Sequence, residues 1–114
     1  MGYGDDDVYC SPEKFGLTSV GELCDPTLYY EFSILAVWQR AEDGVLFWAT
    51  DSGCSCPSPF ENHTSVNDLQ RIDDVTAFVR EARSWVSGQE IQRDDVERLV
   101  RKVRRLAKKQ EAAA

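Results

Sequence analysis

The sequence predicts an α+β fold in which a three-stranded antiparallel meander is followed by two or three helices. One helix packs on the sheet, and the last is a basic C-terminal helix. Three observations lead to this prediction. Apolar side chains alternate along residues 29–50, they recur at helical spacing along residues 74–106, and an irregular stretch rich in cysteine and proline separates the two patterns at residues 51–61.

The length of 114 residues corresponds to one domain. The first ten residues contain two glycines and three consecutive aspartates, and they offer no apolar face to bury. We therefore expect a mobile acidic N-terminus at 1–10, an α+β domain at 11–88 and a basic amphipathic C-terminal helix at 89–114.

The first two strands are expected at Thr18–Cys24 and Tyr29–Gln39, with a turn at Asp25-Pro26 between them. Alternation is poor in the first strand and strong in the second. In the second strand two apolar sets face opposite ways, which is typical of a central strand covered on both sides. One set is Phe32, Ile34, Ala36 and Trp38, and the other is Leu35 and Val37.

The third strand is expected at Val45–Thr50, after a hairpin at 41–44 in which Gly44 supplies a positive φ. Val45, Phe47 and Ala49 face one way, and Leu46, Trp48 and Thr50 the other. A sheet of three strands needs a helix over its apolar face to be stable.

The helical half starts with Ser65, which opens a short helix that reaches about Arg71. Asp73 is expected to cap a second helix from Asp74 to Val86, whose apolar stripe packs on the sheet. The last helix is expected to begin after an N-cap at Gln92.

The cysteine loop 51–61 allows two interpretations. As a structural or binding signature, its candidate residues are Asp51, Ser52, Gly53, Cys54, Cys56, Pro57, Pro59 and Phe60. As a zinc site, the candidate ligands are Cys54, Cys56, Cys10 and His63. The paired cysteine knuckles of structural zinc sites are missing, so cysteines that simply pack a tight loop explain the pattern as well.

Catalysis is not expected. The loop contains no basic residue that could lower a thiol pKa. A serine nucleophile would depend on His63, the one histidine of the chain, and no Gly-x-Ser-x-Gly elbow is present. We expect a protein that is not an enzyme and has no cofactor, with zinc as the alternative.

The charge is divided unevenly along the chain. Residues 1–90 hold 16 acidic and 5 basic residues, whereas residues 91–114 hold 4 acidic and 8 basic ones. The basic face of the last helix comprises Arg98, Arg101, Lys102, Arg105 and Lys109. Its apolar seam comprises Val96, Leu99, Val103 and Leu106. The seam could dock on the domain, on a second copy or on a partner helix, and the basic face could bind DNA.

The location is expected to be cytoplasmic, without a membrane partner. The N-terminus is acidic where a signal peptide is basic and then apolar. No window approaches the roughly 18 apolar residues of a membrane span.

Several segments resemble a family of small uncharacterised proteins of actinobacterial viruses, mycobacteriophages especially. These segments are Ser11-Pro-Glu-Lys-Phe-Gly-Leu17, Val20-Gly-Glu22, Tyr30-Glu-Phe32, Val37-Trp38 and Asp51-Ser-Gly-Cys-Ser-Cys-Pro-Ser-Pro-Phe-Glu61. The last segment is the specific one.

The resemblance covers roughly residues 9–86 and implies a bacterial host cytoplasm and an accessory role without an assigned activity. We therefore expect a non-enzymatic phage-type accessory protein that binds a host or phage protein, with self-association through the C-terminal helix as a further option. The alternatives are a nucleic-acid role, in which the basic helix binds DNA or the acidic body mimics it, and a small zinc-binding module.

Overall fold

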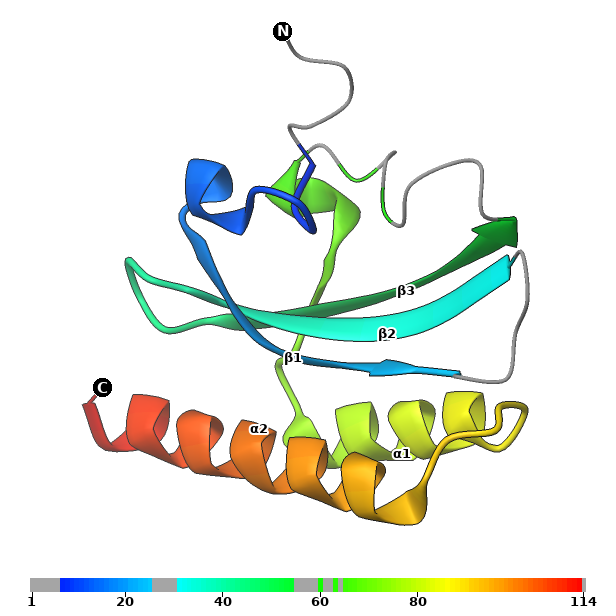
Figure 1. Cartoon of the computed structure of the whole chain (residues 1–114). Coiled ribbons are helices and arrows are strands. Elements are labelled where there is room, and N and C mark those ends of the chain that lie inside the picture. Colours follow the sequence, from blue (N-terminus) through cyan, green and yellow to red (C-terminus); the bar gives the residue numbers. More distant parts are fainter. Residues whose placement is uncertain (1–6, 26–30, 55–59, 61–62, 64, 114) are drawn as a thin grey trace, which may run out of the picture.

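The computed structural model describes residues 7–25, 31–54, 60, 63 and 65–113. Within these residues the chain forms an antiparallel sheet of four strands in the order β1-β2-β3-β4, which is the order of the sequence (Figure 1). The strands are β1 (Leu17–Cys24), β2 (Glu31–Arg40), β3 (Leu46–Cys54) and β4 (Gln70–Arg71). The predicted α+β class and the antiparallel meander are confirmed.

The predicted number of strands is wrong, because β4 adds a fourth. Gln70 and Arg71 pair with Trp48 and Phe47, where a short helix was expected to continue. The helical part of that segment is a 3₁₀ turn, η2 (Val66–Asp68), and Ser65 caps it as expected by accepting a hydrogen bond from the Asn67 N–H. Both residues of β4 are exposed, so they carry no apolar alternation that could reveal a strand.

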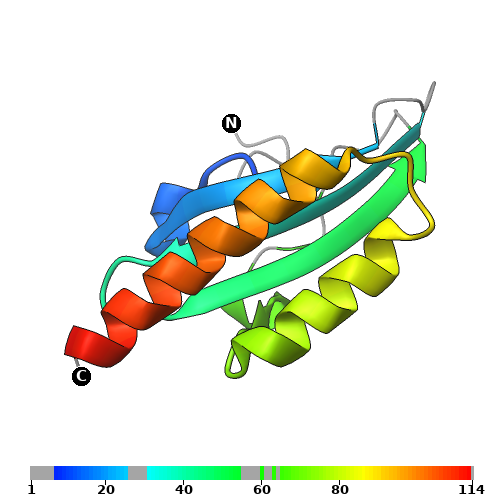
Figure 2. The same cartoon turned by 90° about the horizontal axis from the view of Figure 1, so that it is seen from below.

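Two α-helices cover the same face of the sheet, α1 (Val75–Val86) and α2 (Arg93–Ala113). They run antiparallel to each other across that face (Figure 2). The cap of α1 is Asp74 rather than Asp73, since the Asp74 carboxylate accepts hydrogen bonds from the N–H groups of Thr76 and Ala77. The predicted start of the last helix is confirmed, with the Gln92 carbonyl accepting from the Val96 N–H. No helix in the described part of the chain is long and apolar enough to cross a membrane.

One hydrophobic core lies between the sheet and the two helices. The sheet contributes Val20, Leu23, Leu35, Val37, Leu46 and Trp48, and the helices contribute Phe78, Val79, Ala82, Val96, Leu99, Val100 and Val103. The seam of α2 thus packs inside its own chain, with Leu106 partly buried beside it. Of the predicted alternatives, the seam therefore docks on its own domain. Pairing with a second copy through the same residues would require α2 to leave the sheet.

A second core covers the opposite face of the sheet. The strands supply Leu17, Ile34, Ala36, Trp38, Phe47 and Ala49, and residues outside the strands supply Val8, Val45, Phe60 and Leu69. The predicted facing of alternate residues along β2 and β3 is confirmed by their division between the two cores. The expectation that residues 1–10 have no face to bury is wrong for Asp7 and Val8, which are both fully buried.

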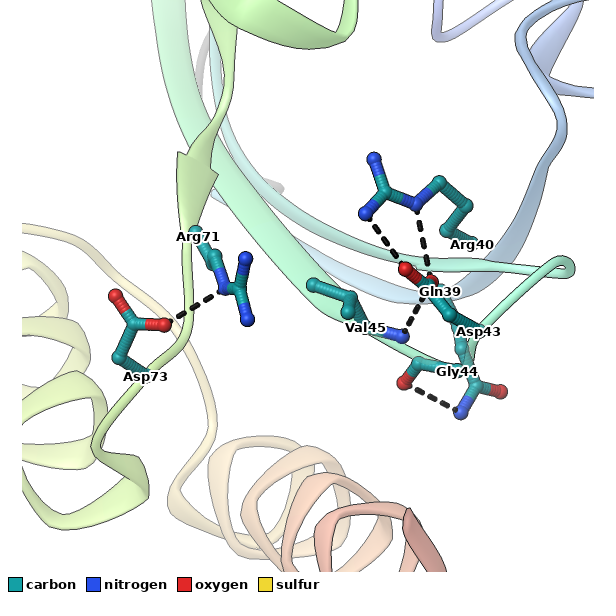
Figure 3. A network of polar contacts seen from close by, with 7 residues as sticks. All are labelled: Gln39, Arg40, Asp43, Gly44, Val45, Arg71 and Asp73. Atoms are coloured by element: carbon teal, nitrogen blue, oxygen red, sulfur yellow. Dashed lines mark hydrogen bonds and ion pairs between the residues drawn. The ribbon is translucent and has the colours of Figure 1, made fainter. Parts of the chain in front are cut away.

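The β2–β3 hairpin is closed by polar contacts at its turn (Figure 3). Asp43 accepts two hydrogen bonds from the Arg40 guanidinium, at 3.0 and 2.7 Å, and one from the Val45 N–H at 3.2 Å. Gly44 has a φ of 76°, as the hairpin predicts, and its carbonyl accepts from the Gln39 amide.

Candidate protein-binding groove

A groove of about 450 Å³ lies between β1 and the first half of α2. One wall consists of the consecutive residues Val20, Gly21, Glu22, Leu23 and Cys24. The other consists of Ile91, Asp95, Arg98, Leu99, Arg101, Lys102 and Arg105. We call this feature the β1–α2 groove.

The strand wall of the β1–α2 groove is the backbone edge of β1. Successive side chains of a strand point to opposite faces of a sheet, so five consecutive residues can line one groove only along the strand's edge. In the sheet order β1 stands at one end, with β2 as its neighbour among the described strands. Its outer N–H and C=O groups therefore face the groove.

A β-bulge at Val20 shapes this edge. Ser19 pairs with Trp38 and Gly21 with Val37, so Val20 is the extra residue. The bulge turns Val20 and Leu23 toward the helices, whereas Leu17 belongs to the core on the other face. The poor alternation of this strand in the sequence has this bulge as its physical cause.

The floor of the groove depends on a close approach between strand and helix. A Cβ atom at Gly21 would lie 3.0 Å from Leu99 Cδ1, which is tighter than nine in ten such contacts in proteins. Glycine at this position lets α2 pack directly against β1. That packing fixes the distance between the strand edge and the basic side chains of the helix.

The helix wall is basic. Four of the five residues of the predicted basic face of α2 line the groove, namely Arg98, Arg101, Lys102 and Arg105. Arg98 forms an ion pair with Asp95 at 3.0 Å. With the residues that the structure describes, Arg101, Lys102 and Arg105 form no ion pair. These three exposed cations are available to an acidic partner.

Glu22 and Cys24 form the rim of the groove on the side away from the helices. Glu22 accepts a hydrogen bond of 2.7 Å from the Tyr9 hydroxyl. Burial, and then the neighbouring Glu22 carboxylate, raise the pKa of the Cys24 thiol. A raised pKa keeps this thiol protonated and works against a role as nucleophile or redox group.

Phe60, the last of the candidate signature residues, packs into the core on the face of the sheet away from the helices. The Asp51 carboxylate accepts a hydrogen bond of 2.7 Å from the Phe60 N–H. The Phe60 ring is fully buried, and it contacts the rings of Tyr9, Trp38 and His63 at centroid distances of 5.3, 5.5 and 5.0 Å. Of the other signature residues, Ser52 is exposed and Gly53 pairs with Phe32.

The zinc interpretation is not supported by the part of the chain that the structure describes. There, no three His, Cys, Asp or Glu side chains come together in a way that could hold a metal ion. Cys10 is exposed, and His63 Nδ1 is buried without a hydrogen-bond partner among the described residues. The side chain of Cys54 lies outside the described residues, as do Cys56, Pro57 and Pro59.

The groove itself could not be found from the sequence. The sequence pattern indicates the basic face of α2. It does not indicate that β1 lies beside this face, because β1 carries no charge pattern and its position at the edge of the sheet follows from the order of the strands. The nearest sequence signal was the irregular alternation around Gly21.

Comparisons with known proteins place the chain in a family that has no assigned activity. Neither the curated proteins nor the solved structures gave a significant match. A family model described as "Domain of unknown function (DUF7574)" matches residues 6–113, which include every strand and helix described above and the whole β1–α2 groove. The chain belongs to this family.

Proposed function

We propose that this chain is a non-enzymatic accessory protein of phage type, which acts in the host cytoplasm by binding an acidic segment of a partner protein in the β1–α2 groove. The observation that carries this proposal is the row of Arg101, Lys102 and Arg105 along an open strand edge, without ion pairs to the described residues.

The charge of the groove contrasts with that of the molecule. The chain as a whole has a formal net charge of −7. Screening in physiological salt acts over about 8 Å. Residues one helical turn apart are separated by about 5.4 Å along the axis, so the cations of the groove reinforce one another locally. Charges on distant surfaces are largely screened from the groove. An acidic segment of limited length fits this local field.

A nucleic acid is a less suitable ligand. Duplex DNA carries about one negative charge per 1.7 Å and needs many phosphate contacts along an extended surface. The basic residues of the groove cover two turns of α2, and Glu22 and Asp95 lie among them. A short protein segment between β1 and α2 can place acidic side chains at the cations and neutral ones beside Glu22 and Asp95.

A charge-reversal experiment tests the proposal. The groove variant carries Arg101→Glu, Lys102→Glu and Arg105→Glu. The matched control carries Arg80→Glu, Arg104→Glu and Lys109→Glu, which are exposed basic residues outside the groove, and it has the same net charge.

The probe is a fluorescent peptide of alternating glutamate and threonine, and its anisotropy is measured against protein concentration. We expect the groove variant to bind at least tenfold more weakly than the natural chain, and the control within about threefold of it. Equal losses in both variants would show that only net charge matters. Tighter binding of a DNA duplex than of the peptide would favour the nucleic-acid alternative. Either result would overturn the proposal.

A further inference from the structure

We infer that the occupant of the β1–α2 groove binds as an added β-strand, an extended segment of four to six residues with acidic side chains at alternate positions. This inference rests on the proposed function of the groove, and it specifies the backbone conformation and the charge pattern of the partner.

The direction of the backbone groups in β1 identifies the contact points. In an antiparallel pair, every second residue directs both its N–H and its C=O toward the neighbouring strand, and the residues between direct both away. The Asp25 N–H donates to the Ser33 carbonyl at 3.2 Å, toward β2. Counting back along the regular pairing, Glu22 and Cys24 present their N–H and C=O groups to the groove.

The length of the open edge limits the length of the partner. The bulge at Val20 interrupts the regular repeat on one side. On the other side, the Asp25 carboxylate accepts a hydrogen bond from the Glu90 N–H at 2.9 Å, which closes the end of the groove. The regular edge between them is Gly21–Cys24, about 13 Å long at the usual rise of a strand. Four to six residues of an extended segment cover this length.

The spacing of the cations sets the charge pattern. Side chains on one face of a strand repeat at about 6.7 Å. Helix residues four apart are separated by about 6 Å along the axis, as Arg98 is from Lys102 and Arg101 from Arg105. Acidic side chains at alternate positions of an added strand would therefore meet successive cations of α2.

The intervening side chains of the added strand face the other side of the sheet. There they meet Glu22, whose carboxylate points toward Tyr9. An acidic residue at an intervening position would be repelled by Glu22. Neutral residues are therefore expected between the acidic ones.

Two hexapeptides of equal composition and charge test the pattern, Glu-Thr-Glu-Thr-Glu-Thr and Glu-Glu-Glu-Thr-Thr-Thr, both capped and fluorescently labelled. We expect the alternating peptide to bind at least fivefold more tightly. Two N-methylated forms of it, with the methyl groups on one or the other set of alternate residues, test the backbone contacts. Only one set of N–H groups faces β1, so we expect one form to lose at least tenfold in affinity and the other to bind like the parent peptide.

A substitution in the protein tests the same contacts from the other side. Cys24→Pro removes an N–H that faces the groove and leaves the pairing with β2 intact, and proline is tolerated on an edge strand in that orientation. The reference is Cys24→Ser, which keeps the N–H. We expect the proline variant to bind the alternating peptide at least fivefold more weakly than the serine variant, at unchanged far-ultraviolet circular dichroism.

The outcomes separate this inference from the proposed function. If both hexapeptides and both N-methylated forms bind equally, while reversal of the groove charges abolishes binding, the added strand is ruled out and the acidic-partner function stands. If no acidic peptide binds the natural chain, both are overturned. A proline variant that remains folded and binds like the serine variant would also rule out the added strand.

Discussion

The Asp51 carboxylate accepts a hydrogen bond from the backbone N–H of Phe60, nine residues further along the chain, at 2.7 Å. Phe60 has a φ of 61°, a left-handed conformation that costs a residue with a side chain about 1–2 kcal/mol. Burial of its ring stabilises the fold by about 1.5–3 kcal/mol, so burial outweighs the strain. The hydrogen bond from Phe60 to Asp51 thus helps to hold an aromatic residue in the second core.

The first prediction concerns this anchor. Asp51→Ala removes the acceptor of a partly buried charged hydrogen bond, which stabilises a protein by about 1.5–3 kcal/mol. We expect the free energy of unfolding in urea to fall by about 2 kcal/mol. Asp51→Asn keeps an acceptor oxygen and should lose less than half as much. Equal losses in the two variants would show that the charge of Asp51, and not the hydrogen bond, is what matters.

The second prediction concerns the contact between β1 and α2. Gly21→Ala places a Cβ atom 3.0 Å from Leu99 Cδ1, and Leu99 is buried in the first core. Overpacking costs about 1–3 kcal/mol, and replacement of glycine in a strand returns only about 0.5–1 kcal/mol. We expect a net loss of about 1 kcal/mol in the free energy of unfolding.

A double-mutant cycle identifies the cause of that loss. In a Leu99→Ala background the clashing methyl group is absent, so Gly21→Ala should cost nothing or even stabilise the chain. If the loss is the same in both backgrounds, it comes from the backbone of β1 rather than from Leu99.

The parts of the fold that could be predicted are those with a regular repeat. The two faces of β2 were readable because apolar residues occupy both sets of alternate positions, and the two cores bear this out. The apolar seam and the basic face of α2 could also be predicted, because their residues recur at helical spacing. The prediction that Leu35 and Val37 share the second face of β2 needed no knowledge of which element covers that face, and the structure shows that the helices cover it.

Other parts depend on contacts between distant residues. β3 extends to Cys54 because Asp51, Ser52 and Gly53 pair with β2, although their composition is typical of a turn. Val8 and Phe60 are isolated apolar residues in polar segments, and only the packed fold shows that both are fully buried. The groove likewise appears only when β1 stands at the end of the sheet and α2 lies beside it.

The third prediction concerns the β2–β3 hairpin. The hydrogen bond from Arg40, helped by the one from the Val45 N–H, lowers the pKa of Asp43 to about 2. Because the pKa of Asp43 is lower in the folded state, the ionised carboxylate stabilises the fold. This contribution to stability is present above the ordinary pKa of about 3.8 and is lost as the pH falls through about 2.

Nuclear magnetic resonance of the side-chain carboxyl carbon can follow this titration. We expect Arg40→Gln to move the midpoint of Asp43 back toward its ordinary value, since it removes the charged donor. Glu42→Gln, a neighbouring change in the same turn, should move it little. An Asp43 midpoint that stays near 2 without Arg40 would contradict the assigned cause.

The last prediction concerns Tyr9, which lies between the groove rim and the second core. Burial of the hydroxyl, and then its hydrogen bond to Glu22, raise the pKa of Tyr9 well above its ordinary value. The folded state therefore favours the protonated phenol. Its contribution to stability is fully present below the ordinary pKa of about 10 and is lost as the pH rises beyond that value.

Tyr9→Phe isolates this contribution from the lysines and cysteines that also titrate in alkali. We expect the free energy of unfolding of the natural chain to fall more steeply than that of the variant between about pH 9 and about pH 11. The difference in tyrosinate absorbance between the two proteins should develop only above the ordinary range. Parallel stability curves would show that the Tyr9 hydroxyl is exposed to solvent and free of Glu22.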